Sequence, residues 1–295
     1  TFHNYGGMWL RGPSNDQSPV PDPADLAVWD WLGEHGERTV PGYRYLVARD
    51  DLYATHGDLD EFAYQVFGIL GYTGEITMSS EFAYRGRSDR PNGPDGNLWS
   101  RRPRLAEKQE FNDHLMAGEM FREWRPYDHP QYGPIEIGGW KPHGVRSTPG
   151  WMLPETLHRN AMFVVWTAMQ LPRVSLAAPT VEHLGDDLWR VRARAVNEGA
   201  IPSLSANYRH RRLGRRDLFT IGGDRVEVLS GGVVVDPYLG RVDPAAHRPW
   251  RLETWLDGDR AREAEWVVRG EGEVTVVYDG PKCGRREVTV ELARE

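Results

Sequence analysis

The hydrophobic pattern changes its period at Pro172, and this change constrains the fold more than any other feature of the chain. Before it, apolar residues recur three or four positions apart in several segments, which is the spacing of amphipathic helices, and short strand-like runs separate them. After it, apolar and polar residues alternate with period two between turns rich in Gly and Asp. The sequence therefore predicts an α/β unit over residues 1–172 and an all-β unit over residues 173–295.

The second unit has the pattern of a β-sandwich of roughly 120 residues. Leu188–Val196, Val274–Tyr278 and Val288–Leu292 alternate as half-buried strands. Short strands at such spacing are typical of an immunoglobulin-like sandwich. One stretch, residues 209–216, is strongly basic, and two interpretations of it stay open. It is either a solvated strand edge, since charge commonly protects edges, or the binding surface for an anionic ligand such as a cell-wall polymer.

The first unit contains several helical segments. A helix is expected after Pro23, with apolar residues from Leu26 and an end near Gly36. A second helix is expected after Asp58, because this N-cap residue precedes Glu61 by three positions, as in a capping box. Further helices are expected over residues 104–124 and 154–170, with a loop over residues 128–140 between them.

Composition and charge exclude some classes of partner. The formal net charge of −7 does not favour a general nucleic-acid surface, so we expect no nucleic-acid partner. Apolar runs of the roughly 20 residues that a membrane span needs do not occur, so we expect no membrane span. A single cysteine, Cys283, excludes an internal disulfide and a cysteine-based metal cluster.

The first thirteen residues carry an unusual combination of residue types. His3 lies close to the start of the chain and is followed by Asn-Tyr-Gly-Gly and an apolar run that ends at Arg11. This pattern predicts the end of a buried strand, and Gly6 and Gly7 allow a sharp turn or a close approach of backbones. Because buried strands rarely begin at a free terminus, we expect this chain to begin inside a domain.

The same segment resembles the part of the M14 zinc carboxypeptidases that carries their third zinc ligand. Two further segments resemble that family in the same order. Residues 52–60, LYATHGDLD, resemble a mobile loop whose tyrosine meets the terminal carboxylate of the substrate, and residues 71–76, GYTGEI, resemble the strand that carries the general base. Tyr53 and Glu75 are separated by 22 residues (75 − 53), which agrees with the usual spacing of that family.

The resemblance implies a fold and roles for named residues. Residues 1–172 would be the second half of a zinc-carboxypeptidase-like mixed-sheet domain, followed by the sandwich. His3 would be a ligand of Zn²⁺ and Glu75 the general base. Tyr53 would close over the terminal residue of the substrate, and Tyr5 would belong to a further subsite.

The resemblance also places a specificity pocket near the start of the second helix. Either Leu59 or Asp60 would line the pocket for the terminal side chain, and the alignment leaves the choice between them open. An apolar residue there would favour apolar termini, whereas an aspartate would favour Lys or Arg.

The implied function is that of a metallocarboxypeptidase, which hydrolyses C-terminal peptide bonds with a zinc-activated water. Its substrate would be a peptide or a peptidoglycan stem, and the family favours a secreted or periplasmic location. In that family a His-x-x-Glu pair supplies the first two zinc ligands upstream, together with an arginine that grips the substrate carboxylate. The 295 residues contain no His-x-x-Glu, so we expect this chain to be truncated and inactive alone.

Two other functions stay open. A degenerate hydrolase fold and a sandwich could together form a non-catalytic binding protein that presents aromatic surfaces to a ligand. A glycosidase that uses Glu75 and Asp60 would need these carboxyl groups about 5–9.5 Å apart, and the spacing of the sequence does not favour it.

Overall fold

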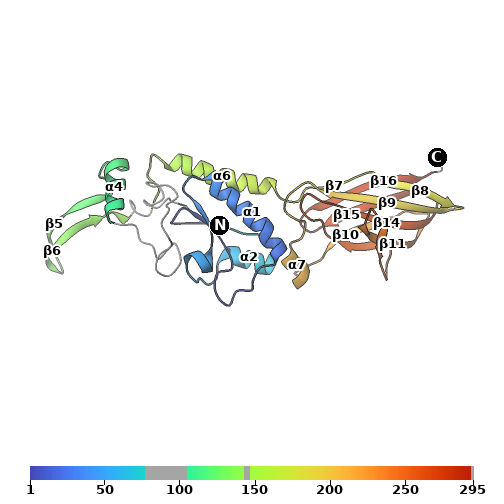
Figure 1. Cartoon of the computed structure of the whole chain (residues 1–295), viewed down its shortest axis with the longest axis horizontal. Coiled ribbons are helices and arrows are strands. Elements are labelled where there is room, and N and C mark those ends of the chain that lie inside the picture. Colours follow the sequence, from blue (N-terminus) through green and yellow to red (C-terminus); the bar gives the residue numbers. More distant parts are fainter. Residues whose placement is uncertain (77–104, 143–146, 294–295) are drawn as a thin grey trace. The chain divides into compact units, whose positions relative to one another are not determined.

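The computed structural model describes residues 1–76, 105–142 and 147–293 and shows a β-rich mixed fold (Figure 1). The chain divides into two compact units, Thr1–Trp166 and Thr167–Glu295. The change of hydrophobic period had placed the boundary at residue 172. Helices are concentrated in the first unit, whereas the second unit is built almost entirely from strands.

A four-stranded mixed sheet organises the first unit. Its strands lie in the order β1 (Phe2–His3), β4 (Thr73–Glu75), β2 (Met8–Arg11) and β3 (Arg44–Val47). β4 runs parallel to β1 and antiparallel to β2, and β2 runs parallel to β3. All four residues of β2 are buried, so this strand is the centre of the unit.

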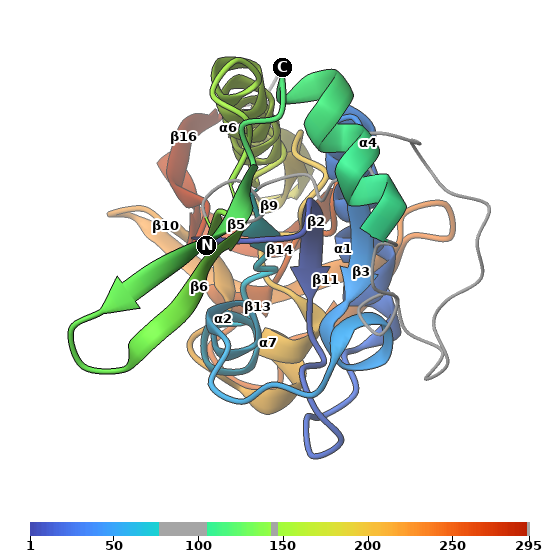
Figure 2. The ribbon, with the colours of Figure 1, turned by 90° about the vertical axis from the view of Figure 1, so that its left-hand side faces the viewer.

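Helix α1 (Pro23–Thr39) begins where the sequence predicted it. The side chain of Asp22 accepts a hydrogen bond from the backbone N–H of Ala24, and a proline occupies the first turn, where its missing N–H costs nothing. α1 lies behind β2 and β3 (Figure 2). It buries Trp29 and Leu32 completely against the sheet, which fixes its orientation.

Helix α6 (Leu153–Met169) agrees with the predicted helix over residues 154–170 and lies beside α1 (Figure 1). A guanidinium N–H of Arg159 donates to the carbonyl of Thr39 at 3.2 Å. The imidazole ring of His35 stacks on Trp166 with a centroid separation of 3.5 Å. Within the described ranges, no helix combines the length and the hydropathy of a membrane-spanning segment.

Helix α2 (Leu59–Phe67) begins after the predicted N-cap Asp58, but the predicted capping box does not form. The Asp58 carboxylate makes no cap hydrogen bond to the helix and instead accepts one from the Thr55 hydroxyl. The helix also buries the face opposite to its apolar stripe. Asp60 and Tyr64 point inward, whereas four apolar residues of α2 are at least two-fifths exposed: Leu59, Phe62, Val66 and Phe67.

Two predictions for residues 104–140 are wrong. Helix α4 (Leu105–Leu115) ends well before residue 124, because Ala117 and Gly118 adopt positive φ angles of 50° and 76°. The predicted loop over residues 128–140 is largely strand. β5 (Phe121–His129) and β6 (Gly133–Trp140) pair antiparallel as a two-stranded hairpin.

The second unit contains two antiparallel sheets around one shared core, as expected for a sandwich. One sheet has the order β13 (Arg251–Thr254), β10 (Asp217–Gly222), β15 (Gly272–Gly280) and β16 (Gly284–Leu292). The other has the order β12 (Arg241–Pro244), β11 (Val226–Asp236), β14 (Ala261–Gly270), β9 (Leu188–Asn197) and β7 (Val174–Leu176), and β8 (Thr180–Gly185) also pairs with β9. Both sheets contribute fully buried side chains to the core, among them Val191, Phe219, Trp266 and Tyr278.

Asn197, the last residue of β9, holds three loops of this unit together. Its Oδ1 accepts hydrogen bonds from the backbone N–H groups of Arg173 and Gly199 at 3.1 and 3.0 Å. Its Nδ2 donates to the carbonyls of Ile201 and Asp257 at 2.9 and 3.3 Å. Because the side chain is fully buried, water cannot replace these four partners.

We expect Asn197→Ala to lower the free energy of unfolding by about 3 kcal/mol, since a buried polar group left without a partner costs about 1–3 kcal/mol. Differential scanning calorimetry of the whole chain measures the effect. Thr180→Ala, on the exposed strand β8, is the control and should leave the melting temperature almost unchanged. Equal melting temperatures for Asn197→Ala and Thr180→Ala would contradict the role assigned to Asn197.

Candidate active site

The structure brings His3 and Glu75 together, although 71 residues separate them in the chain (75 − 3 − 1). They are register partners on the parallel strands β1 and β4. Partners in a parallel ladder project to the same face of a sheet, and here the imidazole Nδ1 lies 3.4 Å from the carboxylate Oε1. The His3 side chain is 70% exposed and the Glu75 side chain is 13% exposed. The imidazole is therefore accessible to solvent, whereas the carboxylate is largely enclosed.

Glu75 is held on both sides by backbone pairing. It is the register partner of Met8 on β2 as well as of His3 on β1, and its carbonyl accepts from the Gly7 N–H at 2.9 Å. Its Oε2 is buried and has no hydrogen-bond partner among the described residues. Burial raises the pKa of Glu75, and the neighbouring His3 opposes this effect. A fixed carboxylate with one free oxygen has the features of a proton acceptor.

The backbone beside Glu75 is tightly packed. A Cβ on Gly74 would lie 2.5 Å from the ring of Trp9, so only glycine fits at this point of β4. The Trp9 ring in turn packs against Phe163 of α6, with a centroid separation of 4.5 Å. The aromatic core therefore fixes the strand that carries the carboxylate.

The two tyrosines predicted to bind substrate lie on different segments of the first unit, Tyr5 between β1 and β2 and Tyr53 after β3. Tyr5 follows β1, is half-buried and forms a cis peptide bond with Asn4. Tyr53 follows the π-helix η1 (Ala48–Leu52) and is 46% exposed. The loop after Tyr53 is anchored, because the Thr55 N–H donates to the Ser14 carbonyl at 2.8 Å. The Tyr53 side chain therefore projects from a tethered loop.

The two candidates for the specificity pocket differ in their surroundings. Leu59 is 57% exposed, whereas Asp60 is 4% exposed. The Asp60 carboxylate accepts a hydrogen bond from the Thr73 hydroxyl at 3.2 Å, two positions before Glu75 on β4. Burial raises the pKa of Asp60 to about 6 from its ordinary 3.8, and the nearby Asp58 adds to this effect. Asp60 is thus enclosed between α2 and β4, and Leu59 is the one open to solvent.

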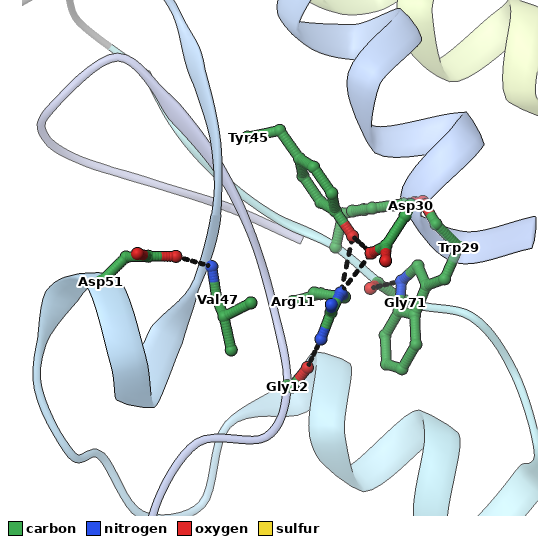
Figure 3. A network of polar contacts seen from close by, with 9 residues as sticks. Arg11, Gly12, Trp29, Asp30, Tyr45, Val47, Asp51 and Gly71 are labelled. Carbon is green, nitrogen blue, oxygen red and sulfur yellow. Dashed lines mark hydrogen bonds and ion pairs between the residues drawn. The ribbon is translucent and has the colours of Figure 1, made fainter. Parts of the chain in front are cut away.

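A buried ionic network supports the site, and the sequence analysis did not identify it (Figure 3). The Arg11 Nε donates to Asp30 Oδ1 and to the Tyr45 hydroxyl, each at 2.7 Å, and a terminal nitrogen donates to the Gly12 carbonyl at 2.7 Å. The Tyr45 hydroxyl donates to the same Asp30 oxygen at 2.6 Å. Burial lowers the pKa of Arg11, but Tyr45 and Asp30 raise it overall, so Arg11 is charged.

This network connects three elements: β2 through Arg11, β3 through Tyr45 and α1 through Asp30. A second bond shown in Figure 3, from the Trp29 indole N–H to the Gly71 carbonyl at 2.9 Å, ties α1 to the chain just before β4. The only sequence signal for this network was Arg11, a charged residue at the end of the otherwise apolar strand β2. The partners of Arg11, Asp30 and Tyr45, are too distant in sequence for residue spacing to reveal them.

The described residues do not complete a zinc centre. A catalytic zinc site uses three protein ligands and leaves one position open for water. His3 offers one exposed imidazole, and the part of the chain that the structure describes contains no group of three His, Cys, Asp or Glu side chains placed to hold a metal ion. A zinc site here therefore requires donors in addition to those described.

The comparison with family models matches part of the second unit. A family model described as "Domain of unknown function (DUF8731)" matches residues 173–291, less than half of the chain. No curated protein matches the chain.

Several solved structures resemble part of the chain. The GAE domain of GGA2p from Saccharomyces cerevisiae is 9% identical, with a TM-score of 0.23, and the match covers 40% of this chain and 86% of that one. The apo PCuAC domain from PmoF1 is 13% identical, with a TM-score of 0.25, and the match covers 42% and 97%. A beta-glycosidase from Bacteroides vulgatus is 13% identical, with a TM-score of 0.24, and the match covers 41% and 14%. Likenesses this low carry no argument about function.

The raised pKa of Asp60 predicts that the stability of the chain depends on pH. The folded chain binds the Asp60 proton more tightly than the unfolded chain, so the contribution of this group to stability is lost as pH rises from 3.8 to about 6. Asp60→Asn removes the ionisation and should raise the free energy of unfolding at pH 8, with little gain at pH 4. The interval between 3.8 and 6 limits the gain to about 3 kcal/mol.

Urea denaturation of both proteins at the two pH values measures this difference. Asp16→Asn is the matched control, because Asp16 is exposed, and it should show no such pH-dependent gain. If Asp60→Asn destabilises the chain equally at pH 4 and pH 8, Asp60 is not the enclosed, weakly acidic group described above.

Proposed function

We propose that the first unit carries part of the active site of a zinc carboxypeptidase that resembles the M14 family. The observation that carries the proposal is the contact between His3 and Glu75, to which the resemblance assigns the roles of zinc ligand and general base. Two segments far apart in sequence supply these residues to adjacent positions of one sheet face. A chance resemblance in sequence would not require such proximity.

In this proposal Glu75 moves the proton of the reaction. One carboxylate oxygen faces the imidazole of His3 and would accept the proton of the attacking water, whereas the other is buried without a partner among the described residues. After the peptide bond breaks, the same carboxyl group returns the proton to the leaving amine. The tight packing of β4 keeps this carboxylate in place through both steps.

Tyr53 and Tyr5 would orient the substrate. The exposed ring of Tyr53 would cover the C-terminal residue, with its hydroxyl at the terminal carboxylate. Of the pocket candidates, the exposed Leu59 is the better placed to contact a terminal side chain, and this favours apolar termini over Lys or Arg. The substrate would be a peptide or a peptidoglycan stem, met in a secreted or periplasmic setting.

Zinc, when bound, would polarise the scissile carbonyl and acidify the attacking water. The described residues supply one imidazole toward it, so the proposal needs two further ligands and a carboxylate-binding arginine from other residues. We also propose that the mixed sheet belongs to a carboxypeptidase-like domain and that the sandwich is immunoglobulin-like. If those ligands are lacking, the rival function is that of a non-catalytic binding protein on a degenerate hydrolase fold.

We expect the protein, once the two further ligands are present, to bind one zinc ion and to release C-terminal residues from peptides. Glu75→Gln should keep the zinc and the melting temperature but lower kcat/KM by at least about 10²-fold, since a general base contributes roughly 10²–10⁴-fold. His3→Ala should lose the zinc. Zinc content is measured by mass spectrometry of the purified protein, and activity by release of the terminal amino acid.

Two variants serve as matched controls. Glu34→Gln changes an exposed glutamate of α1, and His158→Ala changes an exposed histidine of α6. Both should keep zinc and activity. Full activity in a folded Glu75→Gln protein would refute the proposal. A folded protein that binds no zinc and hydrolyses no peptide would instead favour the binding function.

A further inference from the structure

Three arginines surround one tryptophan in the second unit, and we call this group the arginine cluster. The guanidinium carbon of Arg262 lies 4.1 Å from the centroid of the Trp255 ring, that of Arg209 lies 4.3 Å from it, and that of Arg216 lies 5.7 Å from it. All four side chains are half-buried. The cluster lies far in sequence from His3 and Glu75 and plays no part in the proposed peptidase chemistry.

Separate elements of the second unit build the cluster. Arg209 belongs to the last turn of α7 (Ala206–Arg211). Arg216 immediately precedes β10, and Trp255 immediately follows β13. Because the first residue of β10 pairs with the last residue of β13, the ladder brings these two positions next to each other. Arg262 is the second residue of β14, in the other sheet.

This origin corrects one interpretation of the basic stretch, residues 209–216. It is not a strand edge: it forms the end of a short helix and the turn before β10. A basic residue at the end of a helix commonly complements the helix dipole. That explanation covers Arg209 alone, because Arg216 and Arg262 come from outside the helix.

The cluster has too few negative charges for its three positive ones. Arg262 lies 3.6 Å from the Asp257 carboxylate, which also accepts a hydrogen bond from the Trp255 indole N–H at 3.2 Å. Within the described residues, the guanidinium groups of Arg209 and Arg216 have neither an ion pair nor a hydrogen-bond acceptor. The Arg209 Nε is buried without a partner. Two positive charges are therefore uncompensated.

Such an arrangement leaves guanidinium donors available to a ligand. Burial lowers the pKa of Arg262, Asp257 opposes this effect, and the positive charge of Arg209 adds to it. Contact with an aromatic face stabilises each cation, but it leaves the N–H donors of the guanidinium group unused. Planar guanidinium groups match the oxygens of phosphate and bind them with paired hydrogen bonds.

We propose that the arginine cluster binds the phosphate group of a phosphate monoester or of inorganic phosphate. The two uncompensated charges match a dianion. Arg209 and Arg216 would donate to the phosphate oxygens, and Trp255 would hold the guanidinium planes in position. Asp257 balances the charge of Arg262.

Isothermal titration calorimetry of the whole chain with inorganic phosphate tests the site, at low and constant ionic strength, because salt screens exposed charges. We expect one saturable site per chain. Arg209→Gln and Arg216→Gln should each weaken binding about tenfold or more, since a hydrogen bond to a charged group contributes about 1.5–3 kcal/mol. Arg225→Gln is the matched control, because Arg225 is exposed on the same unit and pairs with Glu271, and it should change the affinity less than twofold.

Two further titrations distinguish the source of the phosphate. A soluble sugar phosphate that binds as tightly as inorganic phosphate identifies a small-molecule ester as the ligand. Vesicles of phosphatidylcholine with phosphatidic acid that bind while the sugar phosphate does not identify a lipid headgroup. Both outcomes require loss of binding in Arg209→Gln.

A thermal measurement keeps the test independent of folding defects. Each protein is measured with and without phosphate, because Arg209→Gln both relieves repulsion and loses the contact with Trp255. With phosphate, the wild-type chain should gain stability and the Arg209→Gln chain should not. The proposal is overturned if phosphate does not bind, or if Arg225→Gln weakens binding as much as Arg209→Gln does.

Discussion

A positive charge inside the first unit is the constraint on which the rest of that unit depends. Arg11 is 8% exposed, and its ion-pair partner, Asp30, lies on a helix rather than on its own sheet. Leaving such a charge without its partner costs several kcal/mol, so α1 must lie where Asp30 reaches Arg11. Tyr45 adds a third contact from β3, and the three elements are thereby fixed relative to one another.

The candidate site inherits its geometry from this arrangement. β2, which carries Arg11, is also the strand that pairs with β4. The ring of Trp9 packs closely over Gly74 and so fixes the position of β4 in the core. Glu75 is the next residue of this strand, and its position is fixed with it. The Glu75 carboxylate stays enclosed only if the backbone of β4 does not shift toward the surface. The packing of β2 against β4 provides that restraint.

Much of the fold could be predicted from local signals, and little of the site could be. Pro23 marked the start of α1, and period-two alternation marked β9, β15 and β16, because these signals lie within one element. The positive φ at Ala117 and the pairing of β5 with β6 were missed, since neither leaves a clear pattern in sequence. The exposed apolar face of α2 was also missed, because helical spacing reveals a stripe but not what covers it.

The site residues were predicted through a resemblance rather than from spacing. Pairing of β1 with β4 joins residues that are far apart in the chain, and periodicity carries no information about such a partner. The same reason explains why the Arg11 network and the position of Trp255 were not predicted. For the basic stretch, the sequence showed the charge of Arg209 and Arg216 but not the aromatic ring and the third arginine that converge on them.

The position of β1 has a consequence for how the two site residues respond to fluctuations. Among the described strands, β1 lies at the edge of its sheet, so His3 is paired with one neighbouring strand, whereas Glu75 is paired with two. Local opening begins where few hydrogen bonds must break, so β1 can detach while β4 stays paired with β2. The imidazole and the carboxylate therefore belong to parts of the sheet with different local stability. Anything that binds His3 would be stabilising the weakest strand of the sheet.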